Sequence, residues 1–179
     1  MKDTYTLNVA GLTRELHILP ISDSLSIAAF VMFSDVELTV ACATELLKIA
    51  PEFDVIITAE SKGIPLAYEM ARQCGKNYIL ARKSQKAYMR NPVGYDVNSI
   101  TTKGVQRLYL DSDNLAALKG KRILIVDDVI STGESLHALE QLVGVAEGTI
   151  VGKAAVLAEG DAAERKDILF LEPLPLFFH

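Results

Sequence analysis

The sequence predicts an α/β fold in which a mainly parallel sheet is flanked by helices. Short apolar runs alternate with helical segments of about 10–15 residues, a pattern that favours a parallel sheet. The runs are apolar throughout rather than at every second position, which is typical of strands covered on both faces. The chain has 179 residues, 50% of them hydrophobic and 23% charged, as expected for one soluble globular domain. We therefore expect residues 1–179 to form a single domain.

An antiparallel hairpin is expected at the N-terminus. Residues 4–9 and 14–19 carry alternating or β-prone side chains, Ala10-Gly11 supplies the turn, and Pro20 is expected to end the second strand. The α/β part follows this hairpin.

The remaining elements follow from the spacing of apolar residues. Helical spacing predicts three helices, at residues 35–50, 64–74 and 132–143. Short runs rich in β-branched residues predict five strands, at residues 54–58, 77–81, 122–126, 149–157 and 167–171.

The stretch 84–110 fits neither pattern. It is polar and contains Pro92, Gly94 and Gly104, with only short β-prone pieces such as residues 95–100. We interpret it as a flexible β-ribbon flap, because loops of this length in compact domains are uncommon and usually functional.

Positive charge gathers in and just before this flap. Residues 82–107 hold six basic side chains against one acid, Asp96, in a chain of net charge −5. The pattern favours a polyanionic ligand, although a solvated charged loop has the same composition. The basic residues are Arg82, Lys83, Lys86, Arg90, Lys103 and Arg107.

Composition excludes several classes of protein. A pI of about 5.2 argues against non-specific nucleic-acid binding. The two cysteines, Cys42 and Cys74, are too few for a metal cluster or a disulfide framework. The first residues carry no secretion signal, and the apolar run 26–33 is too short to span a bilayer. We expect a cytoplasmic protein with no nucleic-acid or membrane partner.

The segment 123–135, ILIVDDVISTGES, is the most informative one. Asp127 and Asp128 follow an apolar strand, and a loop that opens a helix comes next. Free N–H groups and the helix dipole suit a phosphate there, while paired carboxylates suit vicinal hydroxyls or a magnesium ion. A sugar phosphate presents both groups. The alternative is a plain strand end followed by a capping box of Ser131 and Glu134.

A second loop of this kind follows the strand 54–58. Lys62 supplies positive charge, Gly63 permits a strained backbone, and a helix start supplies free N–H groups. These features favour a second anion site, with an ordinary solvent-facing turn as the alternative.

Segment 123–135 resembles the phosphoribosyl pyrophosphate (PRPP) signature of type I phosphoribosyltransferases, and the resemblance extends over residues 55–157. It implies that Asp127 and Asp128 hold the ribose hydroxyls. The 5′-phosphate loop that it implies is Ser131, Thr132, Gly133, Glu134 and Ser135. Glu134 departs from the family, which commonly has a second glycine there.

The resemblance also implies a pyrophosphate site and a cofactor. Arg82 joins the two aspartates as a catalytic residue, and Mg²⁺ binds through PRPP, with the aspartates as its possible protein ligands. A small hood, from residues 1–34 and 159–179, covers the site. The implied pyrophosphate residues are Glu60, Ser61, Lys62, Gly63, Arg82, Lys83 and Lys86.

The pattern is closest to the adenine and xanthine members of the family. It implies a homodimeric purine phosphoribosyltransferase of purine salvage, with adenine favoured over xanthine or another 6-oxopurine. Glu159, Phe30 and Phe33 are the residues expected at the base. Alternatives are a PRPP-binding regulator without catalysis and a phosphoacceptor receiver domain, although no separate phosphorylatable aspartate is evident for the latter.

Overall fold

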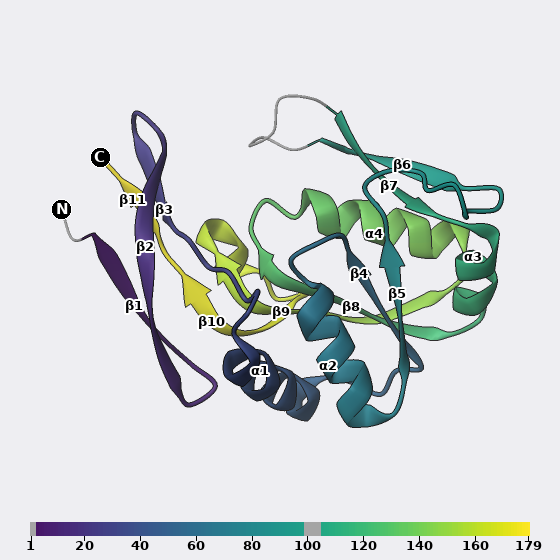
Figure 1. The fold of residues 1–179 in the computed structure, drawn as a ribbon, viewed down its shortest axis with the longest axis horizontal. Helices are drawn as coiled ribbons and strands as arrows, with labels where there is room; N and C mark the ends of the chain where they lie inside the picture. The colour runs from purple at the N-terminus through teal and green to yellow at the C-terminus, as the bar shows by residue number, and fades with distance from the viewer. Residues whose placement is uncertain (1–2, 99–104) are drawn as a thin grey trace.

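The central element is a five-stranded parallel sheet. The computed structural model describes residues 3–98 and 105–179, and there the strand order is β10-β9-β8-β4-β5 (Figure 1). Every neighbouring pair in it is parallel, which confirms the predicted fold class. The strands are β4 (Val55–Ala59), β5 (Asn77–Ala81), β8 (Arg122–Ile130), β9 (Thr149–Glu159) and β10 (Leu169–Leu174).

Helices cover both faces of this sheet. α1 (Val36–Ile49) and α2 (Ile64–Cys74) lie on one face, and α4 (Glu134–Val145) lies on the other (Figure 1). Successive strand residues point to opposite faces, so Leu124 packs in the apolar cluster of α1 and α2, and Ile125 in that of α4. Both faces therefore need apolar side chains. Among the described residues, no helix is long and apolar enough to cross a membrane.

Several strand boundaries differ from the prediction, among them those of β8 and β10. β8 continues past residue 126 to Ile130, because Val129 and Ile130 still pair with β9. Asp127 and Asp128 therefore lie inside the strand rather than after it. The last strand of the sheet begins at residue 169 and not at 167.

The start of α4 also differs. The helix begins at Glu134 rather than at residue 132, and its N-cap is Gly133, whose φ of +82° lies in the left-handed region. No side chain caps the helix, so the alternative of a capping box of Ser131 and Glu134 is wrong. The first N–H groups of α4 are left without a side-chain acceptor, as an anion site requires.

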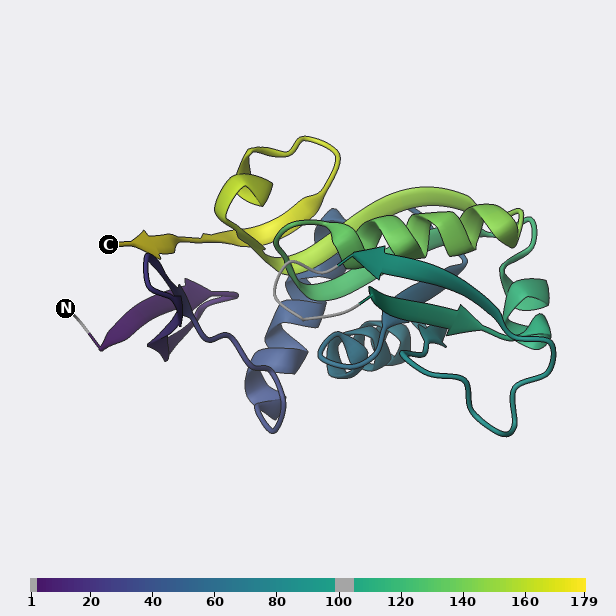
Figure 2. The same ribbon diagram turned by 90° about the horizontal axis from the view of Figure 1, so that it is seen from above.

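A four-stranded antiparallel sheet, here called the hood, lies beside the central sheet (Figures 1 and 2). β1 (Thr4–Val9) and β2 (Leu12–Ser22) form the predicted hairpin, and β3 (Leu25–Ala28) and β11 (Leu176–Phe178) complete the sheet. Pro20 does not end β2; it stays in the strand at a register irregularity, where proline is tolerated. Strands from both ends of the chain share the hood.

An antiparallel ribbon lies on the α4 side of the central sheet (Figure 2). It consists of β6 (Val93–Asn98) and β7 (Val105–Leu110). Mutual backbone hydrogen bonds of 2.8 and 2.9 Å between Arg82 and Tyr109 join β7 to the end of β5. Tyr95 meets His137 of α4 in an edge-to-face contact with the ring centroids 6.5 Å apart.

The predicted flap, 84–110, contains this ribbon. Its tip at residues 99–104, and with it Lys103, lies outside the described residues. α3 (Ser112–Leu118), a helix that the sequence pattern did not indicate, follows the ribbon. Asp111 caps α3 by accepting the N–H of Asn114 at 2.9 Å.

Candidate functional site

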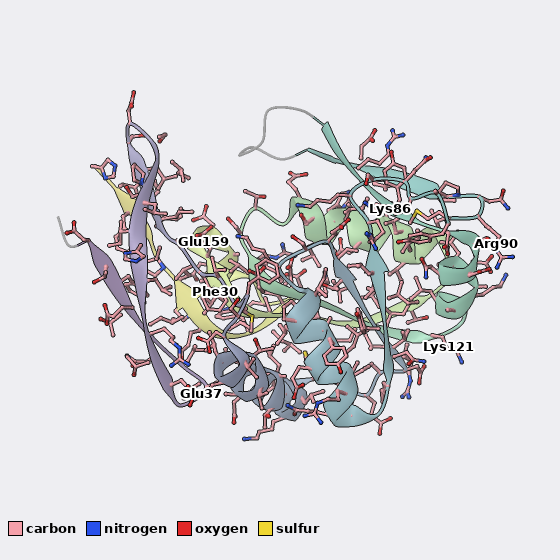
Figure 3. The ribbon with its side chains drawn as sticks, viewed as in Figure 1. Phe30, Glu37, Lys86, Arg90, Lys121 and Glu159 are labelled. Atoms are coloured by element: carbon pink, nitrogen blue, oxygen red, sulfur yellow. The ribbon has the colours of Figure 1, made fainter. Side chains whose placement is uncertain are left out.

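A cleft of about 420 Å³ opens where the carboxyl ends of β8 and β9 face the hood. Its wall has three parts: the segment that leads out of the hood, the acidic pair with the loop after it, and a few side chains from neighbouring elements. In Figure 3, Phe30 and Glu159, which both line the cleft, lie between the hood and the central sheet. The polar lining residues are Lys62, Lys83, Asp127, Asp128, Ser131, Thr132, Glu134, Ser135 and Glu159.

The acidic pair is packed into the wall of this cleft. Asp128 is only 4% exposed and Asp127 is half-buried. An Asp127 Oδ1 atom accepts the N–H of Asp128 at 2.8 Å. The buried Oδ2 atom of Asp128 has no hydrogen-bond partner among the described residues. Since a buried carboxylate oxygen without a partner is costly, it marks a position that a ligand hydroxyl or a hydrated cation can fill.

In the free protein, burial disfavours the charged form of both acids, while the charge of Lys62 acts in the opposite direction. Burial, and then the charge of Asp128, raises the pKa of Asp127 well above its ordinary value. Burial also raises the pKa of Asp128. The free protein therefore holds the pair at a cost in folding free energy, which is typical of functional carboxylates.

The loop after β8 has the form of an anion site. Residues 131–135 all line the cleft, and Gly133 turns the chain into α4. The 12-residue helix directs the positive end of its dipole and its free N–H groups to this loop. Glu134 also lines the cleft and makes no capping hydrogen bond. The acidic pair and the anion loop thus share one cleft.

The loop after β4 packs directly on the acidic pair. A Cβ atom on Gly63 would lie 3.0 Å from Oδ1 of Asp127 and closer still to Oγ1 of Thr58. That Thr58 oxygen is buried and, in the described chain, has no hydrogen-bond partner. Only a residue without a side chain lets the two loops approach in this way. Of the four predicted residues 60–63, only Lys62 lines the cleft.

Glu60 does not line the cleft; its side chain contacts Arg82 and the backbone of Lys83. Its Oε2 atom accepts the N–H of Lys83 at 2.9 Å and lies 3.3 Å from Nε of Arg82. The Lys83 N–H, with the nearby Arg82, holds the pKa of Glu60 below its ordinary value against the effect of burial. Glu60 therefore fixes the chain where it leaves β5.

The structure separates the predicted basic residues. Lys83 lines the cleft with Lys62. Arg82 lies outside the lining, because its guanidinium pairs with Glu60 and donates through Nη1 to the Tyr88 hydroxyl at 2.9 Å. Lys86 donates to Ser84 at 2.7 Å and lies toward the ribbon (Figure 3).

The hood side of the cleft is mostly apolar. Phe30 is buried in its wall, whereas Phe33 is partly exposed and outside the lining. Residues 27–31, Ile130 and Leu174 complete this wall. Their place in this wall could not be predicted from the sequence, because apolar residues in such runs have the same pattern whether they face a core or a cleft.

Comparison with known proteins assigns the family. The profile of the phosphoribosyl transferase domain matches residues 41–173, well over half of the chain. The chain belongs to this family. The match includes both anion loops and the acidic pair, so the resemblance seen in the sequence is confirmed.

The relatives of similar sequence include adenine and hypoxanthine/guanine phosphoribosyltransferases. Adenine phosphoribosyltransferase of Bifidobacterium longum is 37% identical over 116 residues, 63% of this chain and 56% of that protein. Hypoxanthine/guanine phosphoribosyltransferase of Methanothermococcus okinawensis is 33% identical over 123 residues, 68% of this chain and 63% of that protein. The chain thus spans less than two thirds of the length of either relative.

The fold of a solved structure agrees with the family. Adenine phosphoribosyltransferase of Thermoanaerobacter pseudethanolicus superposes with a TM-score of 0.71 at 19% identity, covering 88% of this chain and 95% of that one. At this identity the likeness concerns the fold, and it supports the predicted parallel sheet with its flanking helices.

Substitution of Asp127 by Asn is expected to stabilise the free protein. Because the folded-state pKa of Asp127 is raised, the folded chain loses stability as pH rises through that value. Asp127→Asn removes this loss while its Oδ1 atom still accepts the Asp128 N–H. We expect a gain in the free energy of unfolding of about 1 kcal/mol or more at pH 8, shrinking as pH falls toward 4.

Urea unfolding without magnesium or substrate at pH 5 and pH 8 measures this gain. Asp54→Asn is the control of opposite sign, because hydrogen bonds from Arg122 lower the pKa of Asp54 to about 2. That variant should lose stability at pH 8. An Asp127→Asn protein less stable than the parent at pH 8 contradicts the assignment.

Gly63→Ala is expected to destabilise the protein by about 1–3 kcal/mol, since the added methyl group meets Thr58 and Asp127. Gly144→Ala is the matched control. Nothing lies within 4 Å of that position in α4, and alanine favours a helix by about 0.5–1 kcal/mol. Thermal unfolding compares the two, and equal midpoints for Gly63→Ala and the parent refute the close contact.

Proposed function

We propose that the chain is a purine phosphoribosyltransferase. It transfers the phosphoribosyl group of PRPP to a ring nitrogen of a purine, adenine first, and releases a nucleoside monophosphate and pyrophosphate, a reaction of purine salvage. The observation that carries the proposal is the cleft itself, which Asp127 and Asp128 line together with the loop at the uncapped start of α4. The names of the relatives support the purine class.

The acidic pair and the loop fit the two ends of a ribose phosphate. Asp127 and Asp128 accept hydrogen bonds from the vicinal ribose hydroxyls, and the backbone N–H groups of residues 131–135 bind the 5′-phosphate. Both contacts orient C1 of the ribose toward the apolar wall that contains Phe30. A flat base fits between such a wall and a few polar groups such as Glu159.

The pyrophosphate group lies on the side of Lys62 and Lys83 in this proposal. Both side chains line the cleft, and the backbone of residues 61–63 adds N–H groups at the start of α2, whereas the Glu60 N–H donates to the carbonyl of Ala81. Arg82 reaches the pyrophosphate only when it leaves Glu60 and Tyr88. Glu60 is then a positioning residue, because it holds the Arg82-Lys83 segment at the strand end.

Magnesium fits this site together with the substrate. In the described residues, no group of three or more His, Cys, Asp or Glu side chains is placed to hold a metal ion. The unpartnered oxygen of Asp128 is a hard ligand of the kind that Mg²⁺ prefers, so Asp127 and Asp128 would hold the ion with oxygens of PRPP. When bound, Mg²⁺ offsets the negative charge of the leaving pyrophosphate.

Catalysis then rests on position and charge. A ring nitrogen of the base attacks C1 as the bond from C1 to the pyrophosphate oxygen breaks. The electron pair of that bond leaves with pyrophosphate, and the proton of the attacking N–H group passes to the leaving pyrophosphate or to solvent. Positive charge grows on the ribose ring, where Asp127 and Asp128 stabilise it. Lys62 and Lys83 stabilise the charge on the leaving group. The apolar wall keeps water away from C1.

The first test is a turnover screen. Adenine, hypoxanthine, guanine and xanthine are each mixed with the protein, PRPP and Mg²⁺, and pyrophosphate release is measured. We expect adenine to give the highest kcat/KM. If only a 6-oxopurine gives pyrophosphate release, the proposed base is wrong and the proposed phosphoribosyl transfer is retained. PRPP binding without release from any base supports the alternative of a regulator, which the engagement of Arg82 by Glu60 and Tyr88 favours.

The double variant Asp127→Asn with Asp128→Asn tests the ribose role. Because it removes the charges that stabilise the transition state, kcat/KM for PRPP should fall about a thousandfold or more, while the circular dichroism spectrum stays the same. Asp113→Asn is the control, since Asp113 is an exposed acid paired with Arg90. Near-parental turnover in the double variant refutes the role.

We also propose a cytoplasmic homodimer. Both cysteines are free, with Cys42 in the core and Cys74 partly buried, which fits a reducing compartment. An apolar patch, defined here as Val36, Val40, Pro65 and Tyr68, lines a groove of about 230 Å³ between α1 and α2. Val36 is 74% exposed, and such patches on soluble proteins mark interfaces.

Val36→Glu should shift the protein from dimer to monomer, because it buries a charge in the proposed interface. Val145→Glu is the matched control, since Val145 is 52% exposed at the end of α4 on the other face. Sedimentation velocity measures the oligomeric state of both variants and of the parent protein. A monomeric parent protein, or a dimer that tolerates Val36→Glu, shows that the patch is not the interface.

A further inference from the structure

Arg165 lies against the phosphate loop without lining the cleft. A Cβ atom on Gly133 would lie 2.8 Å from Nη1 of Arg165, so the guanidinium fills the place that a side chain at residue 133 would take. Arg165 is absent from the cleft wall. It follows the short 3-10 helix Gly160–Glu164, more than 30 residues after the loop that it contacts.

An ion-pair network holds this guanidinium in place. Asp167 accepts from Nε at 2.9 Å through Oδ1 and from Nη2 at 2.7 Å through Oδ2. The same Asp167 carboxylate accepts from Lys153 at 2.7 Å. Lys153 also pairs with Glu140 of α4 at 2.6 Å. The network therefore joins β9 and the turn before β10 to the helix whose N-terminus forms the phosphate loop.

Charge holds this arrangement together, although Asp167 is 51% exposed and Arg165 33% exposed. The Lys153 side chain is 19% exposed. Arg165, and then Lys153, holds the pKa of Asp167 well below its ordinary value. Burial alone lowers the pKa of Lys153, but hydrogen bonds to Asp167 and Glu140 outweigh it and raise that pKa. These shifts keep Arg165, Lys153 and Asp167 charged at neutral pH, so the ion pairs of Asp167 persist over the physiological range.

Within the described chain, Nη1 is the one guanidinium nitrogen of Arg165 without a carboxylate partner. It is also the nitrogen that lies against Gly133. A bidentate pair fixes the plane of a guanidinium, so Asp167 determines where Nη1 points. The result is a fixed positive charge beside Gly133, on a residue outside the lining of the cleft.

We propose that Arg165 is a positioning residue of the phosphate loop. It fixes the left-handed backbone at Gly133, so that the loop N–H groups converge on a phosphomonoester of a sugar, and it adds positive charge beside them. The inference rests on the proposed function, because it needs residues 131–135 to receive a phosphate. It extends that function by linking phosphate affinity to the pair of Arg165 and Asp167, neither of which reaches the cleft.

Ribose 5-phosphate binding tests the inference apart from catalysis. Isothermal titration calorimetry is run on the parent protein, Arg165→Met, Arg165→Lys and Asp167→Asn. We expect Arg165→Met to weaken ribose 5-phosphate binding about tenfold, with a smaller loss in Arg165→Lys, which keeps the charge, and in Asp167→Asn, which keeps the arginine. Circular dichroism confirms that each variant is folded.

Steady-state kinetics separates positioning from a general loss of stability. For Arg165→Met the KM for PRPP should rise about tenfold while kcat changes less than threefold, because the contact acts equally on bound substrate and transition state. Arg122→Met is the matched control. Arg122 forms a similar pair with Asp54 at the opposite end of β8, so its loss should lower the unfolding midpoint without changing the KM for PRPP.

The outcomes distinguish this inference from the proposed function. Unchanged ribose 5-phosphate affinity and KM in Arg165→Met overturn the positioning role, whatever the turnover. A parent protein that does not bind ribose 5-phosphate overturns it as well. Weakened ribose 5-phosphate binding in Arg165→Met, with no turnover of any base by the parent, supports the positioning role and refutes the transferase.

Discussion

The burial of two neighbouring carboxylates on the central strand is the constraint on which the rest of the structure depends. β8 lies between β4 and β9, and residues 123–126 are buried on both faces. The strand places Asp127 and Asp128 in the wall of the cleft. Burial there disfavours their charged forms and raises the pKa of each. Apolar packing by helices on both sides must offset that cost. The same strand therefore supplies stability at one end and chemistry at the other.

The parallel sheet then determines which loops lie beside Asp127 and Asp128. Parallel strands end at one edge of a sheet, so the loops after β4 and β8 come together there. Gly63 lets the first loop touch Asp127 directly, and Gly133 turns the second loop into α4. Beside Gly133, Arg165 and its network bring in charge from the C-terminal part of the chain. The loop after β8 is thus held by contacts from several distant segments.

Sequence could predict much of this site, because its signals are local. Apolar runs determine the strands, an acidic pair followed by a glycine-containing loop determines the anion site, and the family profile agrees with the resemblance that these residues carry. The hairpin at 4–9 and 14–19 likewise depends on neighbours in the chain. The ends of the strands were not predicted as well. β8 extends to Ile130 because β9 still offers hydrogen-bond partners there, and no property of residues 127–130 themselves indicates this pairing.

By itself, the sequence determined the parallel sheet and the acidic pair at the end of an apolar strand, since each depends on residues close together in the chain; its two anion loops stay a prediction. Only the tertiary structure decided that β11 pairs with β3, that Glu60 holds Arg82, and that Arg165 lies beside Gly133. These contacts join segments far apart in the chain. Their polar side chains have the same sequence pattern as residues on a solvated surface, so the pattern does not predict the contacts. Their geometry exists only once the sheet has brought those segments together.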